Sequence, residues 1–175
     1  MAAITRNSAA FSVTLPSDRE ITLSRVFDAP RKLVFEAWTR PEHVKLWYGC
    51  RGSSLVLCEI DFRLGGAYRF VTRVADGNVY PMSGVYREIV PPERLVYTER
   101  FNDDPGKEAL ITLTLEERDG RTTLTSVARY RTAEDRDAVL EFGVEKGARE
   151  GFDRLAEHLA TMSHRGRITE TEVRQ

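Results

Sequence analysis

The segment GVEKGAREGFDRLAEHLATM, residues 143–162, has the apolar periodicity of a long amphipathic helix. At 3.6 residues per turn its apolar side chains fall on one narrow face, and charged residues cover the opposite face. The apolar face consists of Val144, Ala148, Phe152, Leu155, Leu159 and Met162. Such a helix is roughly 30 Å long and needs a broad apolar surface to lie on. The sequence therefore predicts a long C-terminal helix that crosses a sheet.

Segments of alternating apolar and polar residues before this helix predict the sheet. These segments cover residues 11–15, 20–27, 55–62, 67–74, 79–90, 94–101, 109–115 and 121–130. Turn signals separate them, and Asp76-Gly77-Asn78 is a strong hairpin signal. We expect a curved antiparallel sheet of about six to seven strands in consecutive order, which is a meander.

Two short helices are expected after the strand at residues 20–27. Asp28 stands two residues before Pro30, which is typical of a helix start: a capping carboxylate, and a proline where no N–H is needed. Pro41 begins the second short helix, which continues through Trp47. The two helices cannot be one, because Pro41 would clash with the preceding turn.

A break is predicted just before the long helix. Thr132 with Asp135 resembles a capping box, so a helix begins near Ala133. If this helix ran on without interruption, its apolar side chains would lie opposite the apolar face of the long helix. We therefore expect a break or sharp bend near Gly143, where glycine supplies backbone freedom.

The composition excludes several classes of function. The chain has 175 residues, enough for one domain, and a formal net charge of −1 with acids and bases interspersed. This balance argues against nucleic acid and against an anionic membrane surface as partners. No apolar run approaches the roughly 20 residues that span a bilayer, so we expect no membrane insertion.

The remaining global features place the protein in the cytoplasm. The N-terminus is polar where a signal peptide would be apolar. Cys50 and Cys58 have no metal or redox spacing, so we expect reduced thiols. We expect a flexible N-terminus over residues 1–10, a single domain over 11–162 and a flexible tail over 163–175.

Several short motifs resemble one known superfamily. They are RVFDAP (25–30), VF (34–35), AWT (37–39), PEH (41–43), Trp47, DFR (61–63), GGAYR (65–69), GVY (84–86), PPERLV (91–96) and RLAEHL (154–159). The chain resembles the START/birch-pollen-allergen-like (SRPBCC) superfamily. More narrowly, it is similar to bacterial proteins related to the C-terminal domain of the activator of the 90-kDa heat-shock protein ATPase. The resemblance extends from about Phe11 to Met162.

The resemblance implies an α+β helix-grip fold with an apolar cavity between the sheet and the C-terminal helix. Relatives use this cavity for lipids, hormones or polyketides. The chain departs from the family at Trp47-Tyr48-Gly49-Cys50, where relatives often have two tryptophans followed by Gly-Pro. The heat-shock activators also carry an N-terminal chaperone-binding domain, for which this chain has no room.

The predicted ligand-binding residues are aromatic or apolar side chains, with one histidine. They are Trp38, Trp47, Tyr68, Phe70, Tyr80, Met82, Tyr86, Tyr97, Phe152 and His158. Tyrosines suit an apolar pocket that orients its ligand by a few hydrogen bonds. Each residue also has a purely structural interpretation: core packing for Phe70, a packed lid for the tryptophans, and a hydrogen-bonded, partly buried ring for His158.

Two carboxylates, Glu59 and Asp61, lie two apart on one predicted strand and so point to the same side. If that side faces the cavity, either is a candidate general acid or base. If it faces solvent, Asp61 simply accepts local backbone hydrogen bonds. The solvent-facing interpretation is favoured.

Three functions remain open. The first is a cytoplasmic carrier or sensor that binds a small hydrophobic or aromatic molecule. The second is a cofactor-free cyclase or hydrolase that uses Glu59, Asp61, Glu99 or His158 for proton transfer. The third is a chaperone-related interaction module. We expect no cofactor and no metal site, because no histidine has a partner at metal-ligand spacing. Exposed strand edges are compatible with a homodimer.

Overall fold

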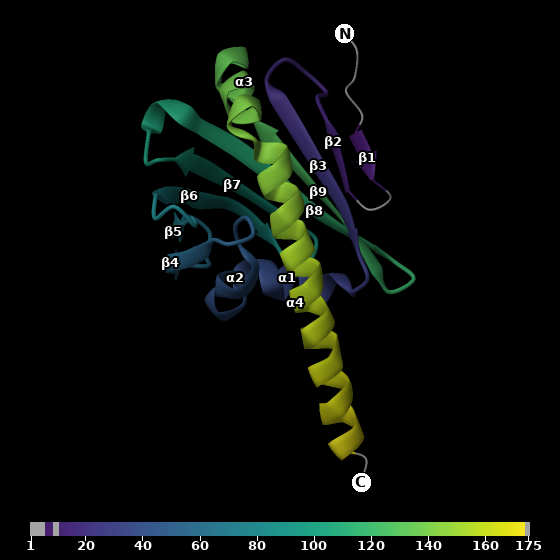
Figure 1. Ribbon diagram of the computed structural model, residues 1–175. Coiled ribbons are helices and arrows are strands. Elements are labelled where there is room, and N and C mark those ends of the chain that lie inside the picture. Colours follow the sequence, from purple (N-terminus) through teal and green to yellow (C-terminus); the bar gives the residue numbers. More distant parts are fainter. Residues whose placement is uncertain (1–5, 9–10, 174–175) are drawn as a thin grey trace.

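One antiparallel sheet and one long helix form the framework of the protein (Figure 1). The computed structural model describes residues 6–8 and 11–173, and side chains over residues 11–166. The strands are β1 (Arg6–Ser8), β2 (Phe11–Thr14), β3 (Glu20–Phe27), β4 (Ser54–Ile60), β5 (Ala67–Arg73), β6 (Val79–Val90), β7 (Arg94–Phe101), β8 (Glu108–Arg118) and β9 (Arg121–Arg129). The helices are α1 (Arg31–Thr39), α2 (Pro41–Trp47), α3 (Ala133–Phe142) and α4 (Val144–Val173), with a 3-10 turn, η1 (Pro105–Lys107).

The strand order across the sheet is β1-β2-β3-β9-β8-β7-β6-β5-β4. Strands β4 to β9 form the predicted meander, and β3 joins its far side by pairing with β9. The predicted α+β helix-grip fold is confirmed. The sheet has nine strands, more than the predicted six to seven. β2 corresponds to the predicted segment at residues 11–15, whereas β1, which is three residues long, lies in no predicted segment. A segment of three residues is too short for alternation to be recognised.

The two short helices form as predicted, although the first begins differently. Pro41 is the first residue of α2. The residue that precedes α1 is Pro30, and no side chain caps this helix locally. Instead, the Glu117 Oε2 atom on β8 accepts a hydrogen bond of 2.8 Å from the Arg31 backbone N–H. The prediction that Asp28 caps α1 is therefore wrong, because a carboxylate from a distant strand takes that role.

The predicted break at Gly143 is confirmed. Gly143 ends α3 in the left-handed conformation, with φ of 95°, and α4 starts at the next residue. The predicted helix end at Met162 is wrong, because α4 continues to Val173 and projects past the sheet (Figure 1). The apolar face does end near Met162, but no proline follows to stop the helix. Residues 174–175 of the predicted tail, and 1–5 and 9–10 of the predicted N-terminus, lie outside the described residues.

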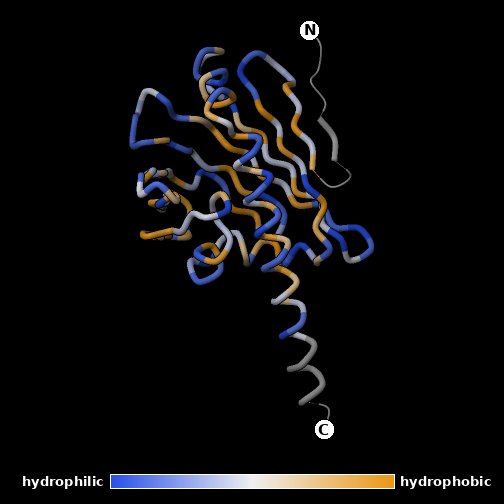
Figure 2. The backbone as a smooth tube through the Cα atoms, in the orientation of Figure 1, coloured by the Kyte–Doolittle hydropathy of each residue, from blue (hydrophilic) through white to orange (hydrophobic). Residues whose placement is uncertain are grey.

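Phe152 stands at the centre of the contact between α4 and the sheet. Its ring lies 5.9 Å from that of Phe11 and 6.0 Å from that of Phe27, both in edge-to-face geometry. Leu155 and Leu159, one and two turns further on, are also buried. Figure 2 shows hydrophobic segments along the strands behind α4 and hydrophilic hairpin ends away from it.

None of the described helices combines the length and the apolar character needed to cross a membrane.

Candidate ligand-binding site

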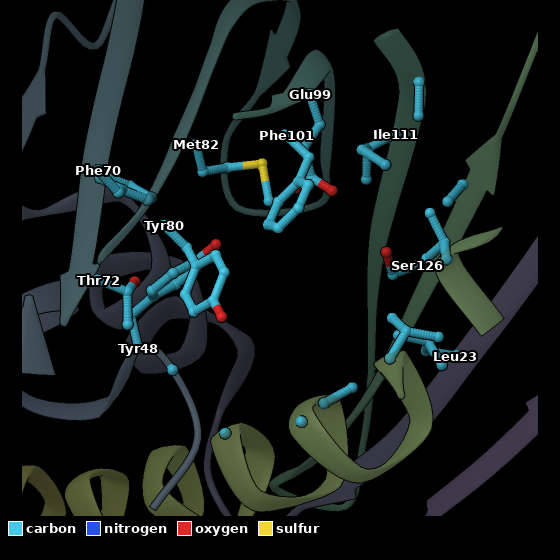
Figure 3. Close-up of a pocket in the computed structure, with 18 of the residues that line it drawn as sticks. Leu23, Tyr48, Phe70, Thr72, Tyr80, Met82, Glu99, Phe101, Ile111 and Ser126 are labelled. Atoms are coloured by element: carbon cyan, nitrogen blue, oxygen red, sulfur yellow. The ribbon is translucent and has the colours of Figure 1, made fainter. Parts of the chain in front are cut away.

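A cavity of about 670 Å³ lies between the sheet and the helices α3 and α4. Small-molecule pockets typically enclose about 300–1,000 Å³. Nine of the ten predicted ligand-binding residues line it: Trp38, Trp47, Tyr68, Phe70, Tyr80, Met82, Tyr86, Tyr97 and Phe152. Figure 3 shows Tyr48 and Tyr80 on one side of the space, and Leu23 and Ser126 across from them.

Strand register aims the aromatic side chains into this space. Phe70 on β5 pairs with Met82 on β6, and Met82 pairs in turn with Phe101 on β7. Tyr86 lies opposite Tyr97 on the same two strands. Because side chains alternate along a strand, each of these pairs presents its side chains to the same face of the sheet.

Two glycines of α4 serve different purposes along the cavity. A Cβ atom built on Gly151 would lie 3.5 Å from the Gly49 carbonyl oxygen, which is an ordinary van der Waals contact with the loop after α2. A Cβ atom on Gly147 would meet nothing within 4 Å, and this residue lines the cavity. Gly151 therefore lies against the loop after α2, and Gly147, one turn earlier, lies beside open space of the cavity.

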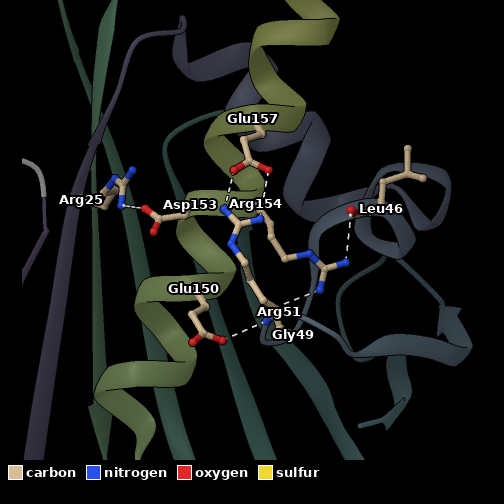
Figure 4. A network of polar contacts seen from close by, with 8 residues as sticks. All are labelled: Arg25, Leu46, Gly49, Arg51, Glu150, Asp153, Arg154 and Glu157. Atoms are coloured by element: carbon tan, nitrogen blue, oxygen red, sulfur yellow. Dashed lines mark hydrogen bonds and ion pairs between the residues drawn. The ribbon is translucent and has the colours of Figure 1, made fainter. Parts of the chain in front are cut away.

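The loop after α2 is fastened to α4 by charged side chains (Figure 4). Arg154 Nη1 donates to the carbonyl oxygens of Tyr48, Gly49 and Cys50 at 3.3, 3.2 and 3.0 Å. The backbone N–H of Arg51 donates to Glu150 Oε2 at 2.9 Å, and its guanidinium pairs with Glu157.

This network fixes one wall of the cavity. Tyr48, Gly49 and Cys50 all line the space, and the Cys50 carbonyl oxygen also accepts from the Ser53 hydroxyl at 2.6 Å. Helical periodicity does not reveal the network, since by that pattern these charged residues belong only to the solvated face of the long helix.

Glu99 on β7 is a carboxyl group that lines the cavity (Figure 3). Burial raises its pKa from 4.5 to about 7. Among the side chains that the structure describes, none forms a hydrogen bond or an ion pair with it. Its neighbour Arg100 points to the other face of the sheet and pairs with Glu108 at 2.6 Å. Near neutral pH this carboxyl group is therefore present in both protonation states, within an apolar enclosure.

Tyrosines surround this carboxyl group. They are Tyr48, Tyr68, Tyr97 and Tyr130, and burial raises the pKa of each phenol, as it does for Tyr86 elsewhere in the lining. Tyr68 donates to the Thr98 carbonyl oxygen at 2.8 Å. All these phenols stay neutral at physiological pH, so they offer hydroxyl groups and ring faces but no charge.

An aromatic cluster lies at the α3 end of the cavity. Tyr80 and Phe101 are stacked at 5.9 Å, and Phe142 contacts both rings at 5.7 and 5.1 Å. Phe142 is 64% exposed, so it covers this end of the cavity from the solvent side. Lys107 and Asp135 add polar groups to the lining.

The comparisons with known proteins agree with this geometry. Residues 28–160 match the model of the family described as "Activator of Hsp90 ATPase homolog 1-like protein". The chain belongs to this family. Among curated proteins no significant match was found.

Solved structures of other bacterial proteins share the fold of this family member. A protein from Rhodobacter sphaeroides is 28% identical with a TM-score of 0.80, and the match covers 87% of this chain and 99% of that one. One from Nitrosomonas europaea is 26% identical with a TM-score of 0.78, covering 86% and 99%. One from Chromobacterium violaceum is 29% identical with a TM-score of 0.70, covering 82% and 98%. The resemblance predicted from the motifs is confirmed.

Tyr48 marks where this family member departs from the tryptophan expected by resemblance. Its ring lies 4.9 Å from that of Phe70 and 5.8 Å from that of Trp47. The substitution therefore brings a phenol into the cavity wall, and the Arg154 contacts hold its backbone in place.

His158 lies outside the cavity. Its Nε2 atom is 2.9 Å from Nδ1 of His43, so the two rings join α4 to α2. Burial, and then the charge of His43, lower the pKa of His158. His158 is a partly buried, hydrogen-bonded ring. It does not line the cavity with the other predicted ligand-binding residues.

Glu59 and Asp61 face solvent, as favoured in the sequence analysis. Asp61 Oδ2 accepts a hydrogen bond of 2.8 Å from Arg63 Nε. Val56 on the same strand is exposed as well, at a register shift between Leu55 and Leu57. Of the carboxylates considered for proton transfer, Glu99 alone lines the cavity among the described residues.

Proposed function

We propose that the protein binds a small hydrophobic or aromatic molecule in the cavity between the sheet and α4, and acts as a cytoplasmic carrier or sensor. The observation that carries this proposal is the cavity itself. Protein interiors are normally close-packed, and the lining of this partly open space of about 670 Å³ makes fewer contacts than a packed interior would. A ligand that fills the space restores those contacts.

The lining supports the proposed chemistry. It combines aromatic rings from β5, β6 and β7 with a few polar groups, among them Glu99, Thr72 and Ser126. A mostly apolar pocket with a few convergent polar groups is typical of sites for small organic molecules. Family membership supports the fold on which this proposal rests.

The test fills the cavity from the helix. Gly147→Leu places a side chain where a Cβ meets open space beside the lining, and Gly166→Leu makes the same change on the same helix away from the cavity. Both gain the same helix propensity, so they are matched. An environment-sensitive dye such as ANS should bind the wild type and Gly166→Leu equally, and Gly147→Leu at least about tenfold more weakly.

A library of lipids and aromatic compounds should then displace the dye from the wild type. If Gly147→Leu binds the dye as well as the wild type does, the dye does not report on the cavity. If in addition no compound of the library binds the wild type by calorimetry, the proposed function is refuted.

One observation favours a second candidate, a cofactor-free enzyme. A carboxyl group with a pKa of about 7 exchanges protons near neutral pH, as a general acid or base must. In this case Glu99→Gln should abolish turnover while ligand binding persists. Binding without turnover in the wild type would leave the carrier or sensor role.

A further inference from the structure

The surroundings of Glu99 indicate which chemical group a ligand must bring to the cavity. The carboxyl group lies on β7, with the small side chain of Ala109 opposite on β8. It accepts no hydrogen bond from any side chain that the structure describes. A buried carboxylate without a partner is costly. A ligand that supplies a partner for it therefore gains most of its affinity at Glu99.

Among the side chains that the structure describes, none adds positive charge at Glu99. Burial alone accounts for the raised pKa of Glu99, with no contribution from a nearby positive charge. Arg100 is engaged with Glu108 on the other face of the sheet, and Lys107 and Asp135 line the cavity near α3. Positive charge at Glu99 therefore has to come from the ligand.

The groups that face Glu99 are phenols from four different parts of the chain. They are Tyr48 from the loop after α2, Tyr68 from β5, Tyr97 from β7 and Tyr130 after β9. The charge of Glu99 adds to burial in raising the pKa of each, so all four lie within its electrostatic reach. Aromatic rings next to a carboxylate suit an organic ammonium group, because ring faces attract cations.

We infer that the cavity selects hydrophobic or aromatic amines, whose ammonium group pairs with Glu99 while the apolar body fills the space toward Phe152. This inference rests on the proposed function and names its ligand class. An ammonium group offsets the cost of the buried carboxylate through a charge-assisted hydrogen bond. A neutral analogue of the same shape lacks that compensation, and an anion would place two like charges together in a medium of low polarity.

Three indoles of matched size test the inference by calorimetry at pH 8: tryptamine, tryptophol and indole-3-acetate. The wild type should bind tryptamine at least about tenfold more tightly than tryptophol, and indole-3-acetate most weakly. Glu99→Gln keeps the shape of the side chain and removes its charge. In this variant the affinity for tryptamine should fall to that for tryptophol. The affinity for tryptophol should change less than about threefold.

A matched control variant and a measurement on the wild type alone complete the test. Glu59→Gln removes an exposed carboxylate from β4 and should leave all three affinities unchanged. At pH 7, tryptamine binding to the wild type should release protons, since pairing with the ammonium ionises the protonated fraction of Glu99. Calorimetry in two buffers of different ionisation enthalpy measures this release, and it does not depend on whether Glu99→Gln folds.

The inference is overturned if the wild type binds tryptamine and tryptophol equally well, or if Glu99→Gln still prefers tryptamine. Either result leaves the proposed function standing. Binding of tryptamine without proton release at pH 7 would also count against the pairing with Glu99. If none of the three indoles binds and no library compound binds either, the proposed function itself has failed.

Discussion

Replacing Glu99 with Gln should change how the stability of the protein depends on pH. Burial raises the pKa of Glu99 from 4.5 to about 7, so the folded state holds this proton more tightly than the unfolded state does. The stabilising contribution of the protonated group is complete below pH 4.5 and is lost as the pH rises through about 7. At about 1.4 kcal/mol per pH unit, the loss amounts to about 3 kcal/mol.

Urea unfolding followed by tryptophan fluorescence measures this effect at pH 4.5, 6 and 8. Glu99→Gln carries no titrating group, so its free energy of unfolding should increase relative to the wild type by about 3 kcal/mol between the lowest and the highest pH. The exposed Glu59→Gln variant is the control, and it should track the wild type. A constant difference between Glu99→Gln and the wild type would refute the reasoning. So would a wild type that gains stability relative to the variant as the pH rises.

The remaining predictions concern how α4 is held on the sheet. Phe152→Ala should lower the free energy of unfolding by about 3–5 kcal/mol, whereas Phe142→Ala, at an exposed position, should cost under about 1.5 kcal/mol in the same urea titration. Arg154→Met keeps an unbranched apolar stem but loses the bonds to the carbonyl groups after α2, so it should cost about 1.5–3 kcal/mol. Amide hydrogen exchange over residues 48–51 should also accelerate in Arg154→Met and not in Arg63→Met; equal exchange in both would contradict the role given to Arg154.

Sequence periodicity predicted the framework because each element carries its own local signal. The apolar face around Phe152 indicated a helix on a sheet, and Gly143 indicated where that helix must begin anew. Alternation along β5 and β6 indicated which aromatic residues share a face. The same alternation cannot tell whether a face is packed solid or borders a cavity, since that depends on how far apart two layers lie.

The features that the sequence did not predict depend on distant parts of the chain. Arg154 contacts the carbonyl of Cys50, 104 residues away, and no local pattern marks such a contact. Glu99 was considered beside Glu59 for proton transfer, and alternation places it on the same face of its strand as Tyr97 and Phe101. The two carboxylates differ because this face of β7 borders the cavity, whereas Glu59 points to the solvent side of β4.

Native mass spectrometry of the protein purified gently from its own cells tests the central claim most directly. The account predicts a mass above that of the chain alone, from a small molecule that stays bound in the wild type and in Gly166→Leu. The added mass should be missing from Gly147→Leu, whose new side chain occupies the cavity. An added mass retained equally by both glycine variants, or only the bare chain in all three proteins, would contradict it.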